Sequence, residues 1–200
     1  HLKEAANLQN RSAEFTLFLT LPAAAALLVM SEPIVRLVFE RGRFSADSTV
    51  IVSHILAIYG LGLPAFVLIK AFIPGFFARE DTRTPMIFAA VSVVVNVSLA
   101  LTLFPRMGAA GIATAEITAG WVNALMLFFT LVKRGHWGQD LGLLSRIPRL
   151  VFAAGLMAAG LYFAIGWLAW PLSSAAPLGM RAGTVAALVV VAMIVYFGAA

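Results

Sequence analysis

The sequence contains no cysteine, and charged residues make up only 12% of its 200 positions. The absence of cysteine excludes disulfides and thiolate metal sites. An average soluble domain is about a quarter charged, so this chain has too little polar surface to cover a soluble globule of its size. Hydrophobic residues make up 62% of the sequence, and the mean hydropathy is +0.96. These values predict an integral membrane protein.

Sequence signatures of enzymes are missing as well. There is no Gly-x-Ser-x-Gly segment, no His-Glu-x-x-His and no carboxylate cluster suited to a metal. We therefore expect neither enzymatic activity nor a cofactor. The net charge of +5 arises from bases between apolar runs, where lipid headgroups explain them better than nucleic acid does. Because the chain begins with His1 and stops inside an apolar run, we expect it to be a piece of a longer polypeptide.

Six apolar runs are long enough to cross a bilayer core of about 30 Å as helices. Small residues between 108 and 120 predict close contact of the fourth run with neighbouring helices. Pro33 is expected to end the first run, and the mixed charged and apolar residues of segment 33–41 predict a short amphipathic interfacial helix. We divide the chain into two parts: residues 1–135 contain four of the runs, and residues 136–200 contain the other two. The runs span 15–30, 50–72, 86–104, 109–132, 150–170 and 182–200.

Lysine and arginine favour one side of this bundle by eight to five. The richer side carries the N-terminal end and the loops 73–85 and 133–149. Cytoplasmic loops of membrane proteins carry an excess of these residues. The count therefore predicts that the N-terminal end and these two loops lie in the cytoplasm.

Four polar residues lie within the runs and are candidates for a substrate cavity. Lys70 either extends its amine to the interface or faces a cavity that receives an anionic substrate. Glu116 is the only acidic residue inside the six runs. It is protonated, paired or in contact with water, which suits proton or cation coupling or a hydrogen bond to another helix. Asn96 and Asn123 either bridge helices or line a pore.

The stretch 59–85 is the most distinctive part of the sequence. An apolar run that contains Lys70 ends at Pro74-Gly75 and is followed by a short, highly charged loop. We interpret this loop as a cytoplasmic hinge or gate, with a tight turn capped by Asp81 and Thr82 as the structural alternative. The loop contains Arg79, Asp81, Thr82, Arg83, Thr84 and Pro85.

This stretch resembles the most distinctive block of the MurJ/MviN family. The segment 39–45, with Gly42 between two phenylalanines, and the segments 108–115 and 121–124 resemble that family in the same order. The resemblance covers nearly the whole chain, although the last two runs match only in hydropathy and position.

The resemblance implies an all-α integral membrane protein, a lipid II flippase of the multidrug/oligosaccharidyl-lipid/polysaccharide exporter superfamily. Such proteins move the undecaprenyl-linked peptidoglycan precursor across the bacterial inner membrane by alternating access. They have fourteen helices in two lobes, and this chain resembles helices nine to fourteen. The last two helices of the family form an apolar groove for the lipid tail. The rest of the polypeptide, lipid II and membrane lipids are the expected partners.

The resemblance leaves the headgroup site and the driving force open. The family's principal cavity arginines belong to helices outside this chain. Some members bind sodium through an Asn and an Asp one turn apart. Asn96 matches the Asn, but Ala100 stands at the second position, so only a displaced carboxylate, Glu116, could complete a cation site. Proton, sodium and membrane potential all stay open, as do a sister exporter of another lipid-linked oligosaccharide or drug and a non-transporting membrane scaffold.

Overall fold

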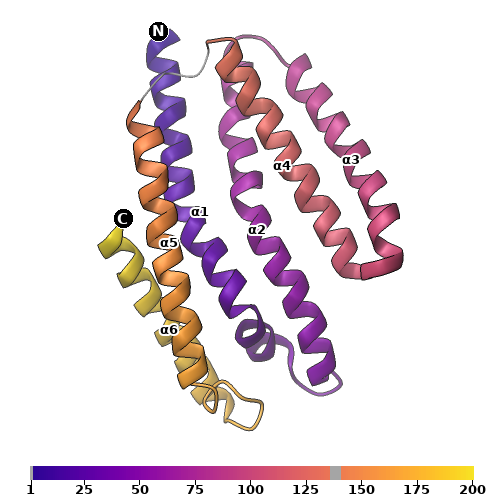
Figure 1. Ribbon diagram of the computed structural model, residues 1–200, viewed down its shortest axis with the longest axis vertical. Coiled ribbons are helices and arrows are strands. Elements are labelled where there is room, and N and C mark those ends of the chain that lie inside the picture. Colours follow the sequence, from indigo (N-terminus) through magenta and orange to yellow (C-terminus); the bar gives the residue numbers. More distant parts are fainter. Residues whose placement is uncertain (1, 136–140) are drawn as a thin grey trace. The chain divides into compact units, whose positions relative to one another are not determined.

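The computed structural model describes residues 2–135 and 141–200, with side chains from residues 11 to 135 and 147 to 200. It contains six helices, each with a segment long and apolar enough to cross a membrane, which confirms the six predicted runs (Figure 1). The helices are α1 (Leu2–Phe39), α2 (Ala46–Phe77), α3 (Arg83–Met107), α4 (Ala109–Lys133), α5 (Leu141–Trp167) and α6 (Leu178–Ala199).

The sequence predicted that the first helix ends at Pro33, but the structure contradicts this prediction. The helix continues to Phe39 with Pro22 and Pro33 inside it, so a separate helix over 33–41 is wrong. Proline removes one backbone hydrogen bond and bends a helix, and membrane helices tolerate this loss. Figure 1 shows the last turns of α1 turned out of line with those before them. Likewise α2 passes Pro64 and Pro74 and ends at Phe77.

The chain forms two compact units. The first unit comprises residues 1–20 and 62–148, which include the second half of α2 and all of α3 and α4. Its core joins Ala13 of α1 to Phe72 and Phe76 of α2 and to Leu127 and Leu131 of α4. The N-terminal part of α1 therefore packs on the C-terminal ends of α2 and α4, whose cytoplasmic location stays a prediction.

Glycines bring the helices of the first unit close together. A Cβ atom on Gly62 of α2 would lie 2.6 Å from Ile117 Cγ1 of α4, and one on Gly120 would lie 2.9 Å from Phe66 Cε1. On Gly111 it would lie 2.8 Å from the backbone carbonyl of Leu103 in α3. Real Cβ atoms do not approach other atoms so closely. An added side chain would therefore displace Ile117 or Phe66, and at Gly111 it would meet backbone, so that contact requires glycine. Together the three contacts set the register between neighbouring helices.

The second unit comprises residues 21–61 and 149–200 and includes most of α5 and all of α6. Both helices bury one narrow stripe and leave most of their apolar surface exposed, which suits helices surrounded by lipid. The stripes consist of Leu150, Ala153, Ala154, Met157 and Leu161 on α5, and of Val185, Leu188, Ala192 and Tyr196 on α6.

The contact between α3 and α4 generates a prediction. In the full-length protein, Gly111→Ala should destabilise the fold by about 1–3 kcal/mol, because an added methyl group forces well-packed atoms apart. Gly160→Ala in α5 is the matched control, because a Cβ atom there meets nothing within 4 Å. Thermal unfolding in detergent compares the two. An unchanged midpoint for Gly111→Ala would contradict the contact.

Candidate functional site

The register between α2 and α4 shows which residues of α4 lie beside Lys70, that is, at the same level along the helix axes. Gly62 lies beside Ile117, and Phe66 lies beside Gly120. The two helices run in the same direction, so the same spacing places Lys70 level with Ala124, one residue from Asn123.

Asn96 of α3 lies at a similar level. Gly108, with a φ of 58°, is the single residue between α3 and α4, so the two helices run in opposite directions. Asn96 and Gly120 are equally far from Gly108 along their helices. Asn96 therefore lies level with Gly120, between the levels of Glu116 and Asn123.

The helical period then decides which side of the helices these residues occupy. Successive residues turn by about 100° around an α-helix. On α4, Glu116 and Asn123 are seven positions apart and share one edge, between the stripe that meets α2 and the stripe that meets α3. On α2, Lys70 lies about 60° from the line that meets α4, on the same side as Glu116 and Asn123.

An apolar cavity lies on the opposite side of the α2–α4 contact. Its volume is about 170 Å³, and the lining atoms include no polar surface. Lys70, Glu116 and Asn123 therefore lie across the helix layer from this cavity. The lining residues are Ala13, Leu17, Leu68, Phe72, Trp121, Ala124, Leu125, Phe128 and Ile147.

The four candidates differ in exposure. Lys70 is exposed, whereas Asn96, Glu116 and Asn123 are half-buried. Within the described chain, the buried Oδ1 atom of Asn123 has no hydrogen-bond partner. Leaving a buried acceptor unsatisfied costs about 1–3 kcal/mol.

A metal site with several ionisable ligands is not visible in the described part of the chain. No three His, Cys, Asp or Glu side chains gather there as such a site requires. Asn96 and Glu116 lie on adjoining helices about one turn apart in level, so a cation site that includes both stays a prediction.

The predicted gate loop begins with a tight helix end. The backbone N–H of Asp81 donates to the carbonyl of Phe76 (3.1 Å), and that of Glu80 donates to the carbonyl of Phe77 (3.0 Å). Glu80 has a φ of 57°. These bonds form a Schellman motif, in which glycine usually occupies the left-handed position. A glutamate there strains the backbone.

The gate loop is then joined to α3 and α4 through Asp81. Its Oδ1 accepts the backbone N–H of Thr84 (2.9 Å), and its Oδ2 accepts the Thr84 hydroxyl (2.6 Å). Arg134, at the end of α4, donates to Asp81 Oδ2 (2.5 Å) and to Thr84 Oγ1 (3.1 Å). The bonds from Thr84 and Arg134 hold the pKa of Asp81 well below its usual range. One carboxylate thus ties the loop to two helices.

The other loop residues play different parts. Arg79 Nη1 donates to the carbonyl of Gly75 (2.6 Å) and so caps its own helix. Thr82 and Arg83 are exposed, and Pro85 is buried. The expected capping by Asp81 is present, whereas Thr82 makes no capping hydrogen bond.

Sequence reasoning missed the role of Arg134. It counted this residue only as a cytoplasmic charge, since nothing near it in the sequence names a partner. Its guanidinium also lies 6.0 Å above the ring of the buried Phe76, so the residue contacts the ends of both α2 and α4.

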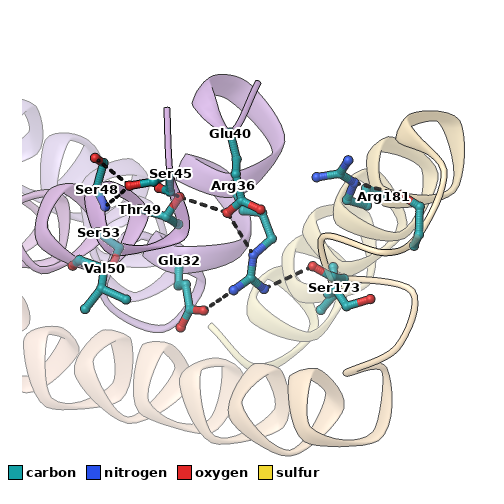
Figure 2. A network of polar contacts seen from close by, with 12 residues as sticks. Glu32, Arg36, Glu40, Ser45, Ser48, Thr49, Val50, Ser53, Ser173 and Arg181 are labelled. Atoms are coloured by element: carbon teal, nitrogen blue, oxygen red, sulfur yellow. Dashed lines mark hydrogen bonds and ion pairs between the residues drawn. The ribbon is translucent and has the colours of Figure 1, made fainter. Parts of the chain in front are cut away.

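A second polar cluster, also missed, lies in the second unit and is shown in Figure 2. Arg36 in the last turn of α1 forms ion pairs with Glu32 and Glu40. It also donates to the backbone carbonyl of Leu172, between α5 and α6 (3.1 Å). The Thr49 hydroxyl at the start of α2 donates to Glu40 (2.8 Å). Arg36 thus joins the end of α1 to a connection that is distant in sequence, and Glu40 joins the same cluster to the start of α2.

The Asp81 contacts generate a prediction. In inside-out vesicles of the full-length protein, Arg134→Gln should speed trypsin cleavage after Arg79 and Arg83, because the loop loses its attachment to α4. Lys133→Gln removes the same charge one residue earlier and should leave cleavage unchanged. Equal cleavage in both variants would contradict the role of Arg134.

The low pKa of Asp81 predicts how the attachment of the loop to α4 depends on pH. The stabilisation is present above the ordinary pKa of 3.8 and is lost only as pH falls further, towards the lowered folded-state value. The ratio of the trypsin cleavage rates of Arg134→Gln and the wild type should therefore stay constant from about pH 6 to pH 8.

Comparison with known proteins points to one family. The family model described as "Lipid II flippase MurJ" matches residues 1–180. A relative named "Probable lipid II flippase MurJ" from Rhizobium meliloti is 78% identical over the whole chain. A "Lipid II flippase MurJ" from Burkholderia cenocepacia is 34% identical over 92% of it. The chain spans 37% and 35% of the lengths of these two relatives.

A solved structure has the same fold. The chain aligns with "Lipid II flippase MurJ, inward closed conformation" with a TM-score of 0.70 and 24% identity. The alignment covers 98% of this chain and 41% of that one. The helical arrangement is therefore one already seen in a larger membrane protein.

Proposed function

Because this chain belongs to the lipid II flippase MurJ family, we propose that it is the C-terminal portion of a flippase. The complete protein moves lipid II, the undecaprenyl-linked peptidoglycan precursor, from the cytoplasmic to the periplasmic leaflet of the bacterial inner membrane. It is a transporter rather than an enzyme. It has fourteen helices in two lobes, of which α1 to α4 belong to the second lobe and α5 and α6 are the last two.

The placement of the polar residues carries this proposal. Lys70, Glu116 and Asn123 lie on one side of the α2–α4 contact, and the other side holds an apolar cavity. Asn96 is seven positions from Leu103 and so lies on the stripe of α3 that meets α4. Charged groups at membrane depth usually serve transport, because an uncompensated charge in lipid is costly. We assign the polar side to the wall of the transport cavity, with the missing helices opposite.

Each polar residue then has a role. The Lys70 ammonium offsets part of the pyrophosphate charge of the substrate. Asn123, whose Oδ1 has no partner among the described residues, accepts a hydrogen bond from the substrate headgroup or from cavity water. Glu116, with Asn96 on the neighbouring helix, couples transport to a proton or a cation, and the membrane potential adds to the driving force.

The lobes rock about the cavity while the lipid tail stays in the membrane. The loop formed by Arg79, Asp81, Thr82, Arg83, Thr84 and Pro85 is the cytoplasmic gate, and the bond from Arg134 to Asp81 steadies it against α4. The exposed apolar surfaces of α5 and α6 contact the undecaprenyl tail.

The first test measures transport in cells whose own flippase is depleted. Lipid II in the outer leaflet is detected by its accessibility to an externally added cleaving toxin. The full-length protein should restore access. Lys70→Ala should lower it because the pyrophosphate loses a counter-charge, and Lys70→Arg should retain most of it. Glu116→Gln should lower it because coupling is lost.

Matched controls make this test specific. Lys133→Gln and Asp47→Asn remove charges of the same signs at exposed positions near the helix ends and should leave access unchanged at equal protein levels. If the inserted wild-type protein fails to restore access, a sister exporter or a membrane scaffold replaces the flippase assignment. If wild-type works and both cavity variants work equally well, this half does not form part of the site.

A second test separates a functional from a structural role of Asn123. Replacing a polar group that lacks a partner by an apolar group of similar size is neutral or stabilising. Asn123→Leu should therefore keep or raise the thermal midpoint of the full-length protein while lowering toxin access. A lower midpoint would instead identify Asn123 as a bridge to another helix.

A further inference from the structure

We propose that Arg36 docks the connection between α5 and α6 onto the end of α1 and so holds the C-terminal helix pair in place. Its predicted effect on transport rests on the proposed function, whereas the docking itself does not. Arg36 thus acts as a positioning residue for the lipid-facing helices.

The guanidinium of Arg36 uses all three of its nitrogens. Nη1 donates to the Leu172 carbonyl (3.1 Å), Nε lies 3.4 Å from Glu40 Oε2, and Nη2 pairs with Glu32 (Figure 2). A lysine has a single ammonium and cannot reproduce this planar fork. The position therefore requires arginine, and the two carboxylates fix the orientation of the group that reaches the connection.

Two of the three charges of the cluster, those of Arg36 and Glu40, are largely removed from solvent, whereas the Glu32 side chain is 49% exposed. The Arg36 side chain is 22% exposed and that of Glu40 is 10% exposed. Glu40 accepts from both Arg36 and Thr49. Loss of the guanidinium would leave a nearly buried carboxylate without its counter-charge. The acids at the end of α1 therefore hold Arg36 beside the connection.

The connection between α5 and α6 contains buried backbone carbonyls that need hydrogen-bond donors. Leu172 and Ala176 are each only 3% exposed, so their backbone carbonyls need hydrogen-bond partners inside the protein. Arg36 from α1 satisfies that of Leu172, and Nε of Arg181 from α6 donates to that of Ala176 (3.1 Å). Arg181 only closes the connection on its own helix, whereas Arg36 joins it to a different part of the unit.

The surrounding helices make such a contact important. The buried stripes of α5 and α6 are narrow and include small residues such as Ala153, Ala154 and Ala192. In lipid, apolar helices gain no hydrophobic free energy by associating, so packing and polar contacts decide whether they stay together. A charged hydrogen bond at one end can then determine how firmly the pair is docked.

The test measures the distance between spin labels at Leu28 on α1 and Phe163 on α5, both exposed and outside the cluster. The full-length protein is used with only these two cysteines, and distances are read by double electron–electron resonance. Arg36→Ala should broaden the distance distribution. Arg36→Lys should give a distribution of intermediate width, broader than that of the wild type and narrower than that of Arg36→Ala. Arg41→Ala is the matched control, because the Arg41 side chain, just after α1, donates only to the backbone carbonyl of Leu37 among the contacts of the described chain.

Toxin access to lipid II, measured on the same variants, should fall several-fold in Arg36→Ala and remain at the wild-type level in Arg41→Ala. An Arg36→Ala distribution as narrow as the wild type would overturn the docking. A broadened distribution with undiminished transport would overturn the positioning role. If Arg36→Ala protein does not accumulate, Arg36→Lys and Glu32→Gln provide the test, and unchanged distances in both would refute the proposal. Failure of the wild-type protein to transport would refute the proposed function without affecting the distances.

Discussion

The close approach of α2, α3 and α4 is the constraint on which the first unit depends. Between helices in lipid, association relies on van der Waals contact and hydrogen bonds rather than on hydrophobic burial. Gly62 and Gly120 let α2 and α4 meet, and Gly111 lets α4 meet the backbone of α3. That register fixes both the level and the side of Lys70 and Asn123. The candidate cavity wall is thus a consequence of glycine placement.

Arginines at helix ends complement this packing. Arg134 joins the end of α4 to the α2–α3 loop, and Arg36 joins the end of α1 to the α5–α6 connection. Each binds a carboxylate and a second acceptor from another segment. A guanidinium costs least near the membrane surface, where its charge is compensated by acids, backbone carbonyls and water. Small residues therefore pack the helix middles, and arginines hold the ends.

The success and failure of the sequence analysis follow the range of the interactions involved. All six helices were predicted because about 20 apolar residues cross a bilayer whatever their neighbours are. Capping by Asp81 was predicted because its partner, Thr84, is three residues away. The break at Pro33 was wrong, because a membrane helix bends at proline where a soluble one often stops. Arg134 and Arg36 were missed because their decisive partners are distant in sequence.

By itself, the sequence determined that this protein is helical and membrane-spanning, which polar residues lie within its runs, and which family it resembles. These properties depend on the composition of short segments. Only the tertiary structure decided that Lys70 of α2 lies on the same side as Glu116 and Asn123 of α4, and which acids and carbonyls each arginine binds. Helix rotation and register arise from contacts between remote segments, here through Gly62, Gly111 and Gly120, and no local pattern specifies them.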